Sequence, residues 1–163
     1  MLRVNQAGEY GATRIYAGQL AVLGRGTPAS HLVARMAAQE QRHLDRFNHL
    51  MSARRVRPTA LQPLWNVAGF ALGAATALMS EQAALACTDA VETEIDRHYG
   101  RQLDELGQTD PELAADISEF RAEELEHRDS AREAGATRAF GYPLLTATIR
   151  AGCRVAIELS KRI

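Results

Sequence analysis

The chain has 163 residues, of which 46% are apolar and 24% are charged, so it is long enough for a single ordered domain, 1–163, with a buried core. Its formal net charge of −1 provides no basic excess for a phosphate backbone, which excludes nucleic acid as an expected partner. Ala, Leu, Arg and Glu dominate, and aromatic residues are sparse, which favours helices over sheets. We therefore expect an all-α protein.

Turn signals divide most of the chain into two helical hairpins. The segment GRGTP ends one helix with glycine and starts the next with Thr27 as N-cap and Pro28 at the first helical position. The segment TDP repeats this device with Asp110 and Pro111. The expected helices are about 3–23 paired with about 28–53, and about 81–106 paired with about 111–134.

Each of these four helices has an apolar stripe at helical spacing, and one glutamate lies in phase with each stripe. A residue in phase with buried apolar residues points inward, so four buried carboxylates are expected. They are Glu9, Glu40, Glu92 and Glu124. Glu40 is followed three residues later, on the same face, by His43, and Glu124 is followed in the same way by His127.

The turns place these residues at one height. In an antiparallel hairpin, residues equidistant from the turn lie level with one another. The midpoint between Glu9 and Glu40 falls in the GRGTP turn, and the midpoint between Glu92 and Glu124 falls at Gln108. Each hairpin therefore sets a lone glutamate opposite a Glu-x-x-His pair, and two hairpins form a four-helix bundle in which four carboxylates and two imidazoles converge.

Four inward carboxylates require compensating charge, because an unpaired buried carboxylate is costly and the stripes contain no lysine or arginine. Two divalent cations would neutralise them, and a mixed carboxylate and imidazole ligand set suits iron or manganese. One Glu from each of two helices with Glu-x-x-His from the other two is typical of ferritin-like di-iron and di-manganese bundles. We predict a dinuclear metal site with the ligands Glu9, Glu40, His43, Glu92, Glu124 and His127.

The remaining titratable residues are weaker candidates. Since each residue turns about 100° around a helix, a solvated position off the stripes is expected for Glu123, Glu126, His31 and His49. His98 and Tyr99 follow Glu92 by about two turns, where they could line a substrate or radical path. Ordinary core packing is the alternative for Tyr99.

A first apolar segment, 59–80, has no charge over 22 residues, which is long enough to span a membrane. However, Gln62, Pro63 and Asn66 interrupt its first part. The remaining run, 67–79, has 13 residues, the length of a core or interfacial helix.

A second apolar segment, 139–163, repeats charged residues along one side, namely Arg150, Arg154, Glu158, Lys161 and Arg162. This pattern predicts an amphipathic helix that lies in a membrane surface, with arginine stems extended toward the head groups. The alternative is that both apolar segments cap the bundle or pair in a dimer.

The cysteines do not form a metal-binding or redox motif, and the N-terminus shows no targeting motif. Cys87 and Cys153 stand far apart in apolar stretches, and we expect both to be buried, reduced thiols. No targeting segment is visible at the N-terminus, which predicts a protein that stays where it is made unless a presequence has been removed.

Several stretches closely resemble the 5-demethoxyubiquinol hydroxylase family of ubiquinone biosynthesis. The likeness covers nearly the whole chain and is carried by QAGEYGATRIYAGQLAVLGR, RVRPTALQPLWNVAGFALGAATAL, AVETEIDRHY, EELEHRD and AGCRVAIELSKR. One departure is Gln6, where histidine is expected in much of the family, but this is not a ligand position. The resemblance implies a ferritin-like four-helix bundle with two additional hydrophobic or amphipathic helices. It makes the same six residues the ligands of a carboxylate-bridged di-iron centre, with a bridging carboxylate from the region of Glu40 or Glu92.

The resemblance further implies a monooxygenase that hydroxylates the ring of 5-demethoxyubiquinol, a late step of ubiquinone biosynthesis. The implied cofactors are two Fe2+ ions per chain, with O2 as co-substrate and electrons from NADH or the quinol pool. No Gly-rich dinucleotide fingerprint is present. The implied partners are a membrane-embedded quinol, the membrane surface, a lipid-binding protein of the same pathway and a second copy of the chain. The implied location is peripheral, on the cytoplasmic face of a bacterial cell membrane or the matrix face of the mitochondrial inner membrane.

Two other functions remain open at this point. A rubrerythrin-like ferroxidase or peroxidase would bind iron without forming an oxygenated product. A helical scaffold at the membrane surface would bind no metal. The apolar segments favour the oxygenase over iron storage, since a ferritin cage needs a hydrophilic exterior.

Overall fold

The protein is all-helical, as the composition predicts. The computed structural model describes residues 1–107 and 109–163, and these ranges contain no strand. The helices in chain order are α1 (Leu2–Val22), α2 (Pro28–Ala53), α3 (Gln62–Met79), α4 (Glu81–Leu106), α5 (Pro111–Glu133), the short 3-10 helix η1 (Ala136–Arg138) and α6 (Tyr142–Arg162). The four hairpin helices begin and end within one residue of the expected positions. Gln108, the expected midpoint of the second hairpin, lies outside the described residues.

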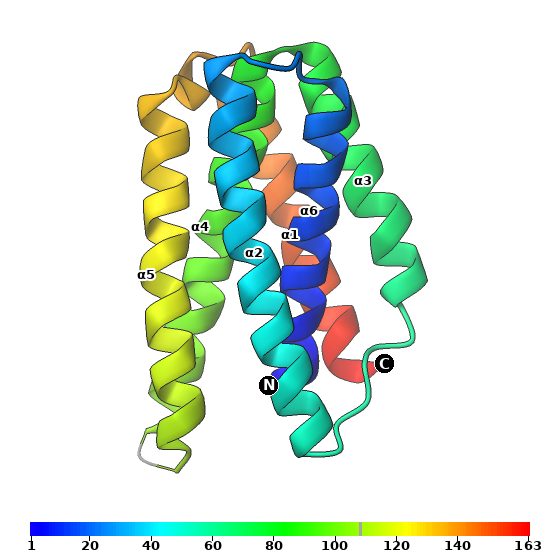
Figure 1. The fold of residues 1–163 in the computed structure, drawn as a ribbon, viewed down its shortest axis with the longest axis vertical. Helices are drawn as coiled ribbons and strands as arrows, with labels where there is room; N and C mark the ends of the chain where they lie inside the picture. Colours follow the sequence, from blue (N-terminus) through cyan, green and yellow to red (C-terminus); the bar gives the residue numbers. More distant parts are fainter. Residues whose placement is uncertain (108) are drawn as a thin grey trace.

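Two antiparallel hairpins, α1 with α2 and α4 with α5, form the bundle (Figure 1). The two apolar segments form α3, which packs along α1, and α6, which packs along α4. Both termini lie at the same end of the bundle (Figure 1). At this end the Ala60 N–H donates a hydrogen bond of 3.3 Å to the Ile163 carbonyl, which ties the start of the α3 segment to the end of α6.

Side-chain caps fix where the helices begin. The Thr27 hydroxyl accepts a 3.1 Å hydrogen bond from the Ser30 N–H, and the Asp110 carboxylate accepts one of 3.2 Å from the Leu113 N–H. Ser80 caps α4 by accepting a 3.0 Å bond from the Ala83 N–H. These caps satisfy backbone donors that have no partner within the helix.

The expected start of the helix in the first apolar segment was wrong. We expected a helix from residue 67, but α3 begins at Gln62. Pro63 lies in its first turn, where a missing N–H costs no hydrogen bond and the fixed φ of proline suits the helix. In the described part of the chain, no helix combines the length and the apolarity required to cross a membrane.

Helix α3 approaches α1 closely enough for the two backbones to touch, because glycines face the contact. A Cβ atom added to Gly73 would overlap the carbonyl oxygen of Ile15, and one added to Gly18 would overlap that of Phe70. A Cβ atom on Gly69 would lie 3.0 Å from the Gly11 carbonyl oxygen. The position of α3 therefore depends on the absence of side chains at this contact.

We expect Gly73→Ala to lower the free energy of unfolding by about 1–3 kcal/mol, the usual cost of overpacking a tight contact. Urea unfolding followed by circular dichroism measures this change. The matched control is Gly152→Ala in α6, where an added Cβ meets nothing within 4 Å in the described part of the chain. The control should leave stability unchanged or raise it slightly, because alanine is the better helix former. Equal stabilities of Gly73→Ala and the wild type would contradict the backbone contact.

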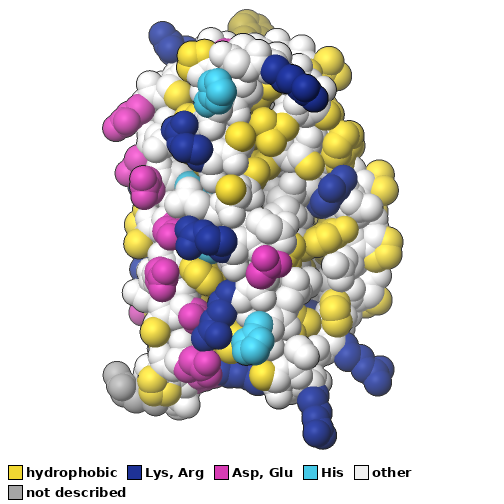
Figure 2. All heavy atoms as spheres, viewed as in Figure 1, with side chains coloured by type: hydrophobic (Ala, Val, Ile, Leu, Met, Phe, Trp, Pro, Cys, Tyr) yellow, Lys and Arg dark blue, Asp and Glu magenta, His cyan; other side chains and the backbone are white. Residues whose placement is uncertain are grey.

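The surface divides into a charged and an apolar part. Figure 2 shows charged side chains over α2 and α5, and hydrophobic side chains along the edge where α3 lies. Large exposed apolar residues on α3 and α6 include Leu64, Val67, Leu78, Met79, Leu144 and Val155. We call this set the apolar α3/α6 surface.

Helix α6 is amphipathic, but two of its charges have a different role from the one expected. Arg150 Nε lies 2.7 Å and Arg154 Nη1 lies 3.0 Å from the same oxygen of Glu94, a buried carboxylate on α4. The prediction that these arginine stems extend toward lipid head groups is therefore wrong for Arg150 and Arg154. They neutralise Glu94 and attach α6 to the bundle.

Candidate metal centre

The six predicted ligands converge in the middle of the bundle. Helix α1 contributes one of them, α2 two, α4 one and α5 two, and all are buried. They are Glu9, Glu40, His43, Glu92, Glu124 and His127. The helical phase that puts each in line with apolar neighbours is what turns each side chain inward.

The six residues form two overlapping groups of potential ligands. The first group contains Glu9, Glu40, His43 and Glu124, and the second contains Glu40, Glu92, Glu124 and His127. Within each group, one ligand atom from every residue lies within 4.8 Å of the others. Glu40 and Glu124 belong to both groups, so they are placed to bridge two ions. Of the two regions expected to provide a bridge, Glu40 belongs to both groups and Glu92 to one.

Both histidines turn the same ring nitrogen, Nδ1, toward the centre. His43 Nδ1 lies 3.1 Å from a Glu124 oxygen and 3.5 Å from a Glu9 oxygen. His127 Nδ1 lies 3.2 Å from an oxygen of Glu40 and 3.2 Å from one of Glu124. The ring of Phe120 stacks on His43 at 4.1 Å between centroids, which restricts the rotation of the imidazole.

The outer ring nitrogens, Nε2, contact two residues that the sequence analysis missed. His43 Nε2 lies 2.6 Å from a carboxylate oxygen of Glu123, and His127 Nε2 lies 3.0 Å from the amide oxygen of Gln39. The prediction that Glu123 is merely solvated is therefore wrong, because its side chain is only 21% exposed and contacts a candidate ligand. Glu126 is exposed, as expected.

Two buried tyrosines hold the two lone glutamates. The Tyr16 hydroxyl donates a hydrogen bond of 2.7 Å to Glu92, and the Tyr99 hydroxyl donates one to Glu9. Burial, followed by the negative charge of the neighbouring glutamates, raises the pKa of both phenols well above the usual value. Both therefore remain neutral donors. Tyr16 was missed because a tyrosine in an apolar stripe has no pattern that separates it from core packing.

The other residues considered in the sequence, Tyr99, three histidines and two cysteines, lie in different environments. Tyr99 lies at the site, whereas the imidazole of His98 bonds to Asn5 and Gln102, away from the six ligands. Burial lowers the pKa of His98 to about 4, which keeps it neutral. His31 and His49 are exposed, as predicted. Both cysteines are free, with Cys87 buried and Cys153 only partly so, and burial raises the pKa of Cys153 to about 12.

The carboxylate oxygens provide a test of whether a metal fits. Among the described residues, one oxygen of Glu9, one of Glu92 and both of Glu40 are buried without any hydrogen-bond partner. A buried polar atom without a partner is expensive, and so many in one place are rarely left unsatisfied. Divalent cations would satisfy them all, and the mixed oxygen and nitrogen donors suit iron or manganese. The site therefore fits the metal pair predicted from the sequence.

Without a metal, the site retains protons. Burial, followed by the charges of the neighbouring glutamates, raises the pKa of Glu40 and Glu92, and burial also raises the pKa of Glu124. Burial alone would lower the pKa of His43, but the hydrogen bond of its Nδ1 with Glu124 and the charges of Glu9 and Glu124 outweigh it and raise the pKa to about 11. Burial also acts to raise the pKa of Glu9, but the close positive charge of the His43 imidazole dominates and lowers it. Metal ions would displace these protons.

We expect the metal-free protein to lose stability as the pH rises from about 7 to about 9. In this range the unfolded chain has released the protons of Glu40 and Glu92 and most of that of His43, whereas folding raises the pKa of all three groups. The folded state then binds more protons than the unfolded state, so unfolding becomes easier by up to about 1.4 kcal/mol per pH unit for each such group.

Urea unfolding of the chelator-treated protein at both pH values measures this slope. The lowered pKa values of Glu9 and His127 oppose it little, because Glu9 has completed its titration in both states by about pH 7 and the unfolded His127 retains only a minor fraction of its proton above that pH. Manganese-loaded protein, whose ligands have lost their protons, should show a much smaller slope. A metal-free protein equally stable at both pH values would contradict the retained protons.

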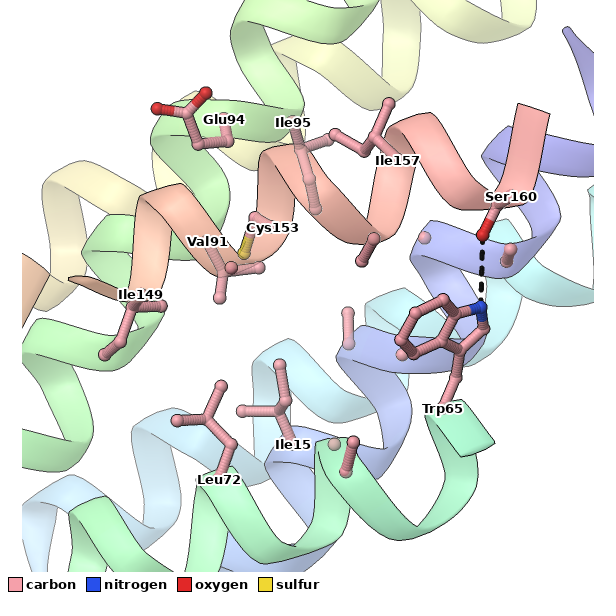
Figure 3. Close-up of a pocket in the computed structure, with 18 of the residues that line it drawn as sticks. Ile15, Trp65, Leu72, Val91, Glu94, Ile95, Ile149, Cys153, Ile157 and Ser160 are labelled. Atoms are coloured by element: carbon pink, nitrogen blue, oxygen red, sulfur yellow. Dashed lines mark hydrogen bonds between the residues drawn. The ribbon is translucent and has the colours of Figure 1, made fainter. Parts of the chain in front are cut away.

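An apolar cavity of about 360 Å³ lies beside the metal centre, with α1 and α3 on one side and α4 and α6 on the other (Figure 3). Figure 3 shows Ile15 and Leu72 facing Val91, Ile149 and Cys153 across it. The Trp65 indole N–H donates a 3.1 Å hydrogen bond to Ser160 at one end.

The inner wall of this cavity consists of the helix turns that carry the two lone glutamates. Gly8 and Ala12 flank Glu9 on α1, and Val91 and Ile95 flank Glu92 on α4; all four flanking residues line the cavity. Its volume and apolar lining are typical of a small-molecule site. A ring bound there would lie next to the ligands without entering the charged face of α2 and α5.

The whole chain has relatives with described functions. Residues 1–160 match the protein family described as "Ubiquinone biosynthesis protein COQ7". A Rhodospirillum rubrum protein named 3-demethoxyubiquinol 3-hydroxylase is 54% identical over 162 residues, covering 99% of this chain and 76% of the relative. A Homo sapiens protein named NADPH-dependent 3-demethoxyubiquinone 3-hydroxylase, mitochondrial, is 53% identical over 167 residues, covering 100% of this chain and 76% of the relative.

A more distant relative is named with a different ring position. The Saccharomyces cerevisiae protein called 5-demethoxyubiquinone hydroxylase, mitochondrial, is 43% identical over 179 residues, covering 100% of this chain and 77% of the relative. All three names describe hydroxylation of a demethoxyubiquinone or its quinol.

Proposed function

This chain belongs to the COQ7 family of ubiquinone biosynthesis proteins, and from that premise we propose that it is a di-iron monooxygenase that hydroxylates the ring of a demethoxyubiquinol with O2. The family assigns it to the hydroxylating oxidoreductases of this pathway. The proposal adds two Fe2+ ions per chain, O2 as co-substrate and the six ligands named above. The observation that carries it is the pair of overlapping ligand groups that share Glu40 and Glu124.

The protein contributes geometry, proton control and the exclusion of water. When bound, the two iron ions would supply the redox chemistry that activates O2. Tyr16 and Tyr99 fix the orientation of Glu92 and Glu9 by donating hydrogen bonds to their carboxylates. Phe120 stacks on His43 and Phe47 packs against Phe120, and these buried rings would limit the access of water to the site.

The cavity is proposed to hold the quinol ring. Its lining is largely apolar, and the only carboxylate in that lining, Glu94, is neutralised by Arg150 and Arg154. An uncharged aromatic ring with an isoprenoid tail suits such a surface better than a charged metabolite does. The ring would then lie beside the turns that carry Glu9 and Glu92.

The source of electrons is proposed to be a reduced nicotinamide nucleotide, directly or through the quinol pool. The family resemblance implies NADH, and the name of the Homo sapiens relative contains NADPH. The proposal therefore covers both nucleotides.

The apolar α3/α6 surface is proposed to rest on a membrane from which the quinol reaches the cavity. Both helices line the cavity, and both expose large apolar residues such as Val67, which is 67% exposed, and Leu144, which is 75% exposed. Such a surface matches an interfacial rather than a spanning mode of attachment. The proposed location is peripheral, on the cytoplasmic face of a bacterial membrane or the matrix face of the mitochondrial inner membrane. A lipid-binding protein of the pathway and a second copy of the chain are proposed partners.

Liposome flotation tests the membrane surface. The wild type should float with the vesicles, and a Val67→Asp/Leu144→Asp variant should not, because a charge in the interface opposes insertion. The control is Ala122→Asp, which adds a charge to an exposed position on α5. Equal flotation of all three proteins would refute attachment through α3 and α6.

Anaerobic Fe(II) titration followed by O2 and product analysis with a short-tailed demethoxyquinol tests the catalytic proposal. Binding of about two iron ions per chain and formation of a ring-hydroxylated product would support it. Iron binding without an oxygenated product would instead identify a rubrerythrin-like ferroxidase or peroxidase. Absence of metal binding would leave only a helical scaffold.

A further inference from the structure

We propose that Glu123 and Gln39 are positioning residues that make the two metal sites unequal, with the stronger site at His43 and the weaker one at His127. The inference rests on the proposed function only in assuming that two divalent cations bind. Glu123 holds the outer nitrogen of His43 with a carboxylate, whereas Gln39 holds that of His127 with a neutral amide.

The two contacts occupy corresponding positions in the fold. Gln39 immediately precedes Glu40 on α2, and Glu123 immediately precedes Glu124 on α5. Glu123 on α5 contacts His43 on α2, and Gln39 on α2 contacts His127 on α5. The two histidines therefore differ in their hydrogen-bond partner, a carboxylate for His43 and a neutral amide for His127.

The tautomer of each ring follows from the metal-binding geometry. Nδ1 of both histidines faces the potential ligands, so a metal ion would take the lone pair of Nδ1 and leave the proton on Nε2. The His43 Nε2–H then donates to Glu123 across 2.6 Å, and the His127 Nε2–H donates to Gln39 across 3.0 Å. The shorter contact is the one with the charged acceptor, as expected for a charge-assisted hydrogen bond.

A carboxylate acceptor increases the electron density that an imidazole offers to a metal, and a neutral amide does so less. The negative charge of Glu123 also lies closer to the His43 site than to the His127 site, which adds to the attraction for a cation there. Arg42 binds Glu123 at 3.1 Å, but its side chain is 58% exposed, so solvent screens much of its charge. The net expectation is stronger metal binding at His43.

Calorimetric titration of the metal-free protein with Mn(II) tests this inference without relying on catalysis. Repulsion between two cations can by itself separate two binding steps, so the decisive comparison is between variants. Glu123→Gln should weaken the tighter step by about 10-fold to 100-fold, the usual effect of changing a hydrogen-bond partner of a ligand. Gln39→Glu should tighten the weaker step. The double variant Glu123→Gln/Gln39→Glu should restore a difference in Mn(II) affinity between the two steps close to that of the wild type.

The matched control is Glu126→Gln, which removes the same charge from an exposed position on the same helix. It should leave both steps within about twofold of the wild type, because the Glu126 side chain is exposed and solvent screens its charge. Melting temperatures of the metal-free variants separate a positioning role from a general loss of structure. If Glu123→Gln failed to fold, Gln39→Glu alone would decide the question.

Two results would overturn the inference: a Glu123→Gln variant with both steps unchanged, or one in which both steps weaken equally. Either would leave the proposed dinuclear centre intact, because two ions would still bind. Absence of Mn(II) binding to the wild type would refute the metal centre itself, and the inference with it. Selective weakening of the tighter step in Glu123→Gln, together with no hydroxylase activity in the wild type, would refute the proposed reaction and support the inference.

Discussion

Glu124→Ala is expected to abolish hydroxylation, because it removes a carboxylate that both groups of potential ligands share. Each ion would lose one of its four protein ligands, and the two ions would lose one of the two carboxylates placed between them. Replacing a residue that only hydrogen-bonds to a metal ligand already lowers metal affinity by about 10-fold to 100-fold. Loss of a shared ligand should exceed that, so metal content after dialysis should fall from about two ions per chain to well below one.

Metal analysis and a single-turnover hydroxylation assay measure these two effects. Glu124→Gln serves as a volume-matched variant that keeps one oxygen ligand and removes the negative charge, and it should bind metal weakly rather than not at all. Glu126→Ala is the control on the same helix, where the side chain is exposed. Full metal content and activity in Glu124→Ala would refute the assignment of the centre.

Cys153→Trp is expected to lower kcat/KM for the quinol by about 100-fold while metal content stays at the wild-type level. Cys153 faces the cavity, and an indole in its place would fill the space in which a substrate ring would bind (Figure 3). Displacing a reacting group by about 1 Å can already cost a factor of that size. The two readouts therefore separate loss of substrate binding from loss of metal.

The control for the cavity is Val155→Trp on the same helix. Because Val155 belongs to the apolar α3/α6 surface, a second control is Ala122→Trp on α5, which is exposed and does not line the cavity, and the same indole there should leave kcat/KM within about twofold of the wild type. If Cys153→Trp retained full activity, the ring would have to bind elsewhere. A proportional loss of metal in Cys153→Trp would show that the variant disturbs the bundle rather than the cavity.

Local sequence patterns were sufficient for the elements and for the six inward residues. The period of the apolar stripes selected Glu9, Glu40, Glu92 and Glu124, and the spacing of three added the two histidines. The capping signals at Thr27 and Asp110 located two helix starts. These features are local, because the phase of a helix and the satisfaction of its first N–H groups depend on residues a few positions apart.

Contacts between helices were not predictable in the same way. The sequence gives no reason to place Glu123 against His43, Tyr16 against Glu92, or Arg150 against a buried Glu94. The cavity was missed for the same reason, since residues from four helices line it and no single segment contains its pattern. The start of α3 differs from the expectation because Gln62 and Pro63 lie in its first turn, which tolerates them, and Asn66 follows on an exposed position.

The sequence by itself determined that this protein is helical, that two hairpins carry four inward glutamates and two inward histidines, and that these lie at one height. The tertiary structure decided that Glu40 and Glu124 are shared between the two groups and that each histidine contacts the opposite helix. Periodicity fixes the direction of a side chain around its own axis. Which atoms meet depends on the rotation and separation of neighbouring helices, and these are set by packing over the whole interface, including the glycines between α1 and α3.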